Sequence, residues 1–170
     1  MTTSGGAPLV APIRVIRTMS VSMLVMPIVL GVVVFVAVPA GGYPPPFLPL
    51  LLGAVAVGGV LLAETVGYAA PPIDPHLSPD LAARAALAQY RTRWLIRSVC
   101  TEIVVLVGLL LSFMLATRWP YLVALVLGWP IMFYELWPAR RLVDKLNLRL
   151  ELEGAISHLD DALHGRRPVS

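Results

Sequence analysis

Residues 91–113 read RTRWLIRSVCTEIVVLVGLLLSF. Three arginines in the first seven positions give way to a long apolar run that contains one acid, Glu102. A water-soluble amphipathic helix would instead distribute its charges along one face. The rest of the chain repeats the pattern, with arginines at one end of each apolar segment and single glutamates just inside it. This arrangement is typical of membrane-spanning helices.

The composition of the whole chain indicates the same class. Hydrophobic residues make up 58% and charged residues 14% of the 170 residues, whereas soluble domains average about 45–50% and about 25%. A chain of this length has too little interior to bury so much apolar surface, so lipid or other chains must cover it. The formal net charge of +3 forms no basic stripe, and we expect no nucleic acid partner.

Four apolar segments are long enough to cross a bilayer, at residues 19–40, 47–70, 98–116 and 121–137. A helix over the first would rise roughly 33 Å, which exceeds the hydrocarbon thickness of about 30 Å. Pro27 is expected to kink it. The alternative for this segment is a signal peptide, since Val38-Pro39-Ala40 resembles a cleavage site, but signal-peptide cores are shorter, about 7–15 residues. We therefore predict an all-α integral membrane protein whose four-span domain covers residues 1–137.

A further helix is expected before the third span. Ser78-Pro79-Asp80 combines an N-cap residue, a proline at the first helical position and an acid in the first turn. No Gly or Pro appears between Asp80 and Val107. One continuous helix over residues 79–116 and two separate helices are both compatible with this pattern.

The last segment, residues 138–170, is predicted to be a cytoplasmic amphipathic tail. Residues 146–153 alternate between apolar and polar side chains, which is typical of a strand. The same residues are nevertheless good helix formers. A helical stripe follows at Leu152, Ile156, Leu159 and Leu163. We predict an amphipathic C-terminal helix with Gly154 as its weak point.

The positions of the basic residues predict the orientation in the membrane. If both termini lie on one side, that side holds all of the 13 Lys and Arg residues except Arg118. Because basic residues stay preferentially in the cytoplasm, we expect a multi-pass protein of a bacterial inner membrane with cytoplasmic N- and C-termini.

Single acids lie inside three of the predicted spans, at Glu64, Glu102 and Glu135. Counted from the span ends they lie roughly 9, 6 and 3 Å deep on the cytoplasmic side. A charge in hydrocarbon costs about 2.5–3.5 kcal/mol at the centre of a span and less near its edge. We therefore expect the acids to face protein and to pair with cations. The arginines at a suitable level are Arg17, Arg93 and Arg97.

Two interpretations of these acids differ in function. They form either a proton relay or a polar site for a lipid headgroup, or they make ion pairs between helices or chains near the interface. We favour the ion pairs, because the deep half of every predicted span lacks His, Asp, Lys and Arg. The sequence therefore offers no continuous polar path across the membrane.

Small residues recur every four positions in the second span, at Gly59, Ala63 and Gly67. Such a stripe lets another helix approach closely, although chance in a Gly- and Ala-rich segment explains it equally well. The neighbouring helix belongs either to this chain or to a partner.

The sequence lacks the motifs of catalysis. His76, His158 and His164 have no metal-ligand spacing, and no GxSxG, HExxH or Walker lysine motif is present. We predict no enzymatic activity, no cofactor and no metal site.

The four-span layout, with Arg91-Thr92 and Arg97 before an apolar helix that holds Glu102 and Gly108, resembles small four-span membrane proteins of actinobacteria. Some of these look like accessory subunits of larger machines, including Mce-type lipid importers. The resemblance covers most of the chain in pattern and assigns no functional residue.

The leading hypothesis is therefore a non-enzymatic accessory or stabilising subunit of a larger bacterial inner-membrane complex, with lipid transport as the candidate process. Its expected partners are membrane lipid and other integral membrane subunits. The alternative is a small homo-oligomeric transporter or channel that uses the cytoplasmic-side glutamate layer.

Overall fold

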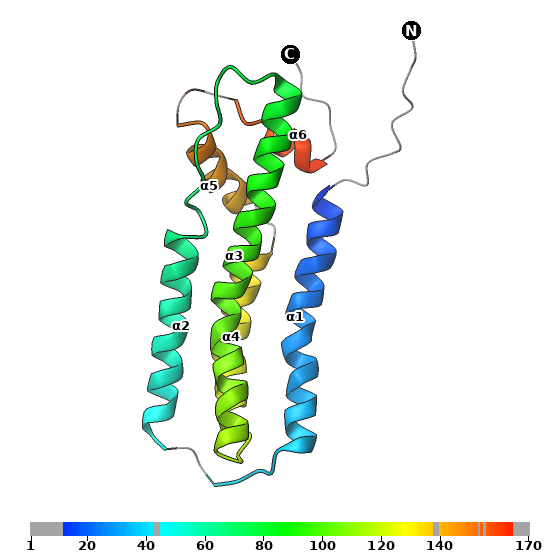
Figure 1. Cartoon of the computed structure of the whole chain (residues 1–170). Helices are drawn as coiled ribbons and strands as arrows, with labels where there is room; N and C mark the ends of the chain where they lie inside the picture. The colour runs from blue at the N-terminus through cyan, green and yellow to red at the C-terminus, as the bar shows by residue number, and fades with distance from the viewer. Residues whose placement is uncertain (1–11, 43–44, 138–139, 153, 155, 165–170) are drawn as a thin grey trace. The chain divides into compact units, whose positions relative to one another are not determined.

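The computed structural model describes residues 12–42, 45–137, 140–152, 154 and 156–164. These ranges contain only helices as regular structure: α1 (Pro12–Ala37), α2 (Phe47–Thr65), α3 (Pro79–Met114), α4 (Trp119–Leu136), α5 (Arg140–Leu150) and α6 (Leu159–His164) (Figure 1). Helices α1 to α4 are long and apolar enough to cross a membrane. The prediction of an all-helical membrane protein with four candidate spans is confirmed at this level.

The boundaries of the helices differ from the ends of the apolar segments, because local residue preferences decide where each helix begins and ends. α1 begins before Met19 because Arg14 and Arg17 are good helix formers that extend the helix beyond its apolar part. It ends at Ala37 because Pro39 disfavours a helical conformation for the residue before it. α2 ends at Thr65, before the predicted end at residue 70, and the chain then turns over residues 66–68.

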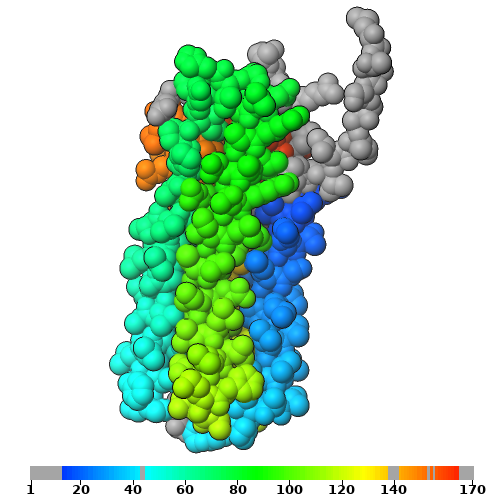
Figure 2. Space-filling view, viewed as in Figure 1, coloured from blue at the N-terminus to red at the C-terminus, as the bar shows by residue number. Residues whose placement is uncertain are grey.

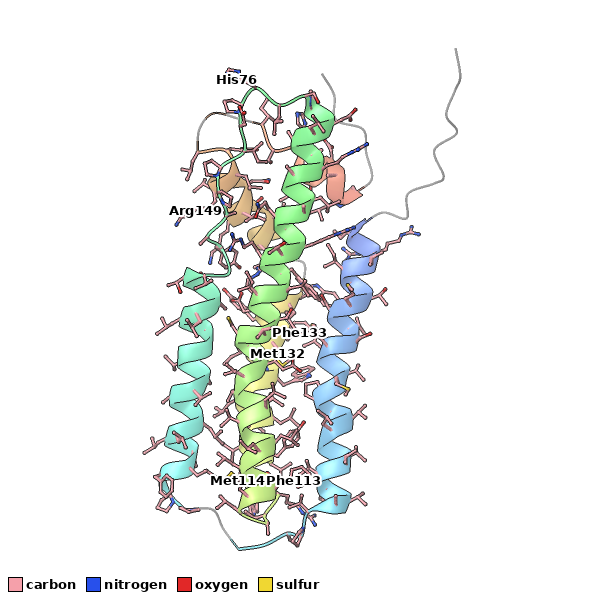
Figure 3. All side chains as sticks on the ribbon, viewed as in Figure 1. His76, Phe113, Met114, Met132, Phe133 and Arg149 are labelled. Atoms are coloured by element: carbon pink, nitrogen blue, oxygen red, sulfur yellow. The ribbon has the colours of Figure 1, made fainter. Side chains whose placement is uncertain are left out.

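The helix through the third span is continuous over 36 residues, from Pro79 to Met114. It ends in a Schellman motif, in which the N–H of Thr117 donates to the Ser112 carbonyl at 3.1 Å and the N–H of Ala116 to the Phe113 carbonyl at 3.4 Å. Ala116 has a φ of 49°, the left-handed conformation that this motif requires. The exposed side chains of Phe113 and Met114 lie on the last turn (Figure 3).

The chain divides into two compact units. The first, which we call the bundle unit, contains residues 20–69 and 92–137 and therefore most of α1 to α4. The second, which we call the tail unit, contains residues 1–19, 70–91 and 138–170. α1 and α3 each contribute residues to both units.

The helices of the bundle unit run antiparallel in chain order and pack through small residues. The Ser20 hydroxyl donates to the Leu136 carbonyl at 2.9 Å, which places the start of α1 in this unit beside the end of α4. A Cβ on Gly108 would overlap the Ala124 methyl group, and one on Gly128 would lie 2.7 Å from Val104. On one face, side chains of α3 fill the space between α1 and α2 (Figure 2). Close backbone approach is the expected packing mode in lipid.

Pro27 lies inside α1, where a proline removes one backbone hydrogen bond. Side chains of α4 hydrogen-bond the backbone around it. The Trp129 indole N–H donates to the Leu24 carbonyl at 3.1 Å, and the Tyr121 hydroxyl donates to the Pro27 carbonyl. Gly31 leaves room for the Tyr121 ring, since a Cβ there would lie 3.3 Å from it. These two bonds join α4 to α1 near the proline.

The loops at the other end of the bundle unit are joined by Thr117. Its hydroxyl lies 3.0 Å from the carbonyl of Ala40 and 3.4 Å from that of Gly42. Gly41 adopts a φ of 59° and lies so close to Thr117 that a Cβ would approach it to 2.6 Å. Arg118 stacks over the Phe35 ring with 4.2 Å between the guanidinium carbon and the ring centroid.

The tail unit has a small apolar core of its own. Three leucines of α5 are buried at helical spacing, Leu142, Leu146 and Leu150, together with Leu159 and Leu163 of α6. The N–H of Ile73 donates to the Leu150 carbonyl at 3.0 Å, which ties the segment after α2 to the end of α5. The alternating sequence of residues 146–150 is therefore helical.

The prediction of a single tail helix is wrong beyond Leu150, because α5 ends there and a separate helix, α6, begins at Leu159. Gly154 has a φ of 83°, which breaks the helix at the predicted weak point. The Ser157 hydroxyl also lies 2.8 Å from a Glu151 carboxylate oxygen and 3.0 Å from the Asn147 amide oxygen, which stabilises the non-helical path. The predicted stripe is divided as a result: Leu159 and Leu163 are buried, whereas Leu152 and Ile156 are exposed.

Candidate functional site

Arg97, Tyr68 and Glu135 form a buried polar cluster in the bundle unit, which we call the Arg97 cluster. Their exposed fractions are 2%, 7% and 2%. Arg97 Nη1 donates to the Tyr68 hydroxyl at 2.8 Å, and the guanidinium carbon lies 4.7 Å from the Tyr68 ring centroid. The hydroxyl of Tyr68 donates in turn to Glu135 Oε2 at 3.5 Å. The tyrosine therefore connects the cation to the acid.

Each member of the Arg97 cluster comes from a different part of the bundle. Arg97 lies on α3, Tyr68 in the turn after α2, and Glu135 in the last turn of α4. A buried charge is tolerated when it is paired and its hydrogen-bonding groups are satisfied. The cluster therefore joins α3 and α4 to the turn after α2 and keeps the arginine and the acid buried within the bundle unit.

Gly67 provides the space that Arg97 occupies. A Cβ at this position would overlap the Cγ of Arg97 and the carbonyl oxygen of Ala63. Any larger residue would push the arginine stem away from α2. The close approach of the two segments thus depends on the absence of a side chain at this one residue.

Backbone carbonyls at the ends of α2 and α4 complete the surroundings of the cluster. Arg93 Nη1 donates to the carbonyl of Val66 at 3.3 Å, just beyond the end of α2. The Leu136 carbonyl at the end of α4 accepts from Trp94 Nε1 at 3.3 Å and from the Ser20 hydroxyl. The last carbonyls of a helix have no partner within it, and they carry its negative partial charge. The negative partial charges at the ends of α2 and α4 therefore stabilise the positive side chains of this region.

The structure brings together part of the residue set predicted from the sequence. Arg97 and Glu135 meet in the cluster through Tyr68, and Arg93 lies one turn from Arg97 on α3. Glu64 is half-buried on α2. Arg17 is exposed on α1 and belongs to the tail unit.

Glu102 differs from the other acids. Its side chain is half-buried on α3, and it makes no hydrogen bond or ion pair with any other residue that the structure describes. The Tyr121 hydroxyl of α4 donates to the Pro27 carbonyl. Arg97, five residues before Glu102 on α3, is hydrogen-bonded to Tyr68.

The stripe of small residues faces α3 of the same chain. Gly59, Ala63 and Gly67 are all buried, and Ala63 is 0% exposed. A Cβ on Gly59 would lie 2.5 Å from the Cys100 carbonyl oxygen. The stripe is therefore used for packing within the bundle.

Sequence reasoning missed Tyr68, Trp94 and Ser20. These residues are uncharged, and their partners lie on helices whose neighbours the sequence does not reveal. One signal did exist for Tyr68, since it directly follows the last glycine of the small-residue stripe.

The chemistry of the Arg97 cluster is that of a fixed cation and an acid joined by a hydroxyl. No group of three or more His, Cys, Asp or Glu residues that could hold a metal occurs in the described part of the chain.

No family model, curated protein or solved structure matches the chain.

Proposed function

We propose that the chain is a non-enzymatic accessory or stabilising subunit of a larger bacterial inner-membrane complex. The observation that supports this most is the exposed apolar surface of the tail unit. Leu148, Leu152 and Ile156 are 73%, 63% and 68% exposed, and they lie outside the four candidate spans. The three fall within nine residues of the chain, and large apolar side chains that are exposed outside lipid favour a surface that another protein covers.

The polar interactions of the bundle unit support the same function. The Arg97 cluster and the bonds to Leu136 join helices of this chain to one another. Many apolar side chains of the spans are exposed around them, such as Val36, Leu50 and Val126 at 81%, 77% and 73%. These surfaces are available to lipid and to the spans of other subunits.

The same proposal includes the orientation of the chain in the membrane and the process that the complex carries out. The basic residues favour cytoplasmic termini. In this orientation the first part of α3, before the third span, and the amphipathic tail lie in the cytoplasm. The resemblance to accessory subunits of Mce-type importers suggests that the complex moves lipid. The competing hypothesis of a homo-oligomeric transporter needs acids that protons or substrate can reach, whereas Glu135 is 2% exposed and bonded to Tyr68.

The experiment is purification of the tagged chain from its native membrane in mild detergent, followed by native mass spectrometry. We expect a particle with other integral membrane subunits in fixed stoichiometry. A variant with Leu148→Ser, Leu152→Ser and Ile156→Ser should lose these subunits and keep the thermal stability of the isolated chain, because the three side chains are exposed in it. Val126→Ser is the control for a change on an exposed apolar residue of a span. Particles that contain only this chain would overturn the proposal in favour of the homo-oligomer.

A further inference from the structure

Glu102 is an acid in a candidate membrane span, and no cation among the described residues of the bundle unit forms an ion pair with it. Acids inside a span normally face protein and pair with a cation. The arginines of the bundle unit are engaged elsewhere: Arg93 with the Val66 carbonyl, Arg97 with Tyr68, and Arg118 over the Phe35 ring.

Glu102 lies at the edge of the lipid-facing side of α3. Ser98 and Val105, on one side of it, are each 1% exposed. Val99 and Leu106, one turn before and one turn after it, are 64% and 47% exposed. Residues three and four apart share a helix face, so a helix that covers Val99 and Leu106 would also reach the carboxylate.

We propose that this face of α3, formed by Val99, Glu102 and Leu106, docks a spanning helix of a partner subunit that carries an arginine or lysine at the depth of Glu102. The inference rests on the proposed function as an accessory subunit and adds which surface is used within the membrane. Charge complementarity selects the occupant, because a cation both neutralises the acid and is itself stabilised by it.

A second copy of the chain does not fit this face. Its own bundle unit would have to offer a cation at the depth of Glu102, but Arg97 is 2% exposed and bonded to Tyr68. Arg93 lies nine residues before Glu102 on α3, and Arg118 lies beyond the other end of that helix. Lipid alone would leave the carboxylate without a positive partner in the hydrocarbon.

The first test uses the chain with Glu102 unchanged, so that folding is not in question. A photo-crosslinking residue is placed at Val99 or Leu106 in the native host, and at Val126 of α4 as a matched control on another exposed face. We expect positions 99 and 106 to capture one companion subunit of the purified complex, in a spanning segment with a basic residue within one helical turn. Capture of a second copy, of lipid only, or of a segment without a basic residue overturns the proposal.

The second test changes the charge. Glu102→Gln should lower recovery of the companion about tenfold, since removing one member of a buried pair leaves the other unpaired, and Glu102→Asp should retain it. Glu64→Gln, a change in another half-buried acid, is the control. Glu102→Arg should abolish recovery, and exchange of the partner's basic residue for glutamate should restore it. Full recovery with both Glu102→Gln and Glu102→Arg overturns the docking proposal while the subunit function stands, whereas a wild-type chain without companions overturns the function itself.

Discussion

At the scale of single residues, Gly67 shows how one missing side chain permits a buried charge. We predict that Gly67→Ala lowers the free energy of unfolding by about 1–3 kcal/mol, as overpacking does in a well-packed core, because the new Cβ overlaps Arg97 and the Ala63 carbonyl. Gly58→Ala, inside α2 and with nothing within 4 Å of its Cβ, should instead stabilise the helix by about 0.5–1 kcal/mol. Thermal unfolding in mild detergent, followed by tryptophan fluorescence, measures both. Equal changes in unfolding free energy for the two substitutions would contradict the close approach of Gly67 to Arg97.

The Tyr68 hydroxyl is the second residue-scale determinant, because it accepts from Arg97 and donates to Glu135. Tyr68→Phe keeps the ring under the guanidinium but leaves a buried arginine N–H without this acceptor. We expect a loss of about 1–3 kcal/mol in unfolding free energy, the usual effect of an unsatisfied buried donor. Arg97→Lys should also destabilise, since an ammonium group does not reproduce the planar guanidinium that stacks on the ring. A Tyr68→Phe protein as stable as wild type would show that the hydroxyl does not connect the cluster.

At the scale of elements, the end of α3 contains a residue that does not suit its conformation. Ala116 occupies the left-handed position of the Schellman motif with a φ of 49°, which costs a non-glycine residue about 1–2 kcal/mol. Ala116→Gly should therefore raise the unfolding free energy by about 1 kcal/mol. Ala54→Gly, at an exposed position inside α2, should lower it by about 0.5–1 kcal/mol. The same chemical change thus has opposite signs at the two sites, and matching signs in thermal unfolding would contradict the assignment of the motif.

The elements also show how much of the fold and of the site could be predicted from the sequence. The four spans were predictable because hydrocarbon demands about 20 consecutive apolar residues per helix. Helix ends were less predictable, since α1 extends through Arg14 and Arg17 while the tail helix stops at Leu150. The site was predictable only as a set of charged residues at one depth. Which acid meets Arg97 depends on helix neighbours, and the answer, Glu135 through Tyr68, involves a neutral residue that a search for charges passes over.

At the scale of the whole molecule, the distribution of basic residues predicts the topology across the membrane. All Lys and Arg residues except Arg118 fall on the side that holds both termini in a four-span arrangement, and such residues are retained in the cytoplasm. In a Cys100→Ala background, which removes the single native thiol, cysteines introduced at Ser4 and Ser170 should resist a membrane-impermeant thiol reagent in intact cells. A cysteine at Gly42, whose Cβ would meet nothing within 4 Å, should react. All three should react after the cells are opened, which controls for buried thiols. Labelling of either terminus from outside would reverse the topology and, with it, the cytoplasmic position proposed for the tail.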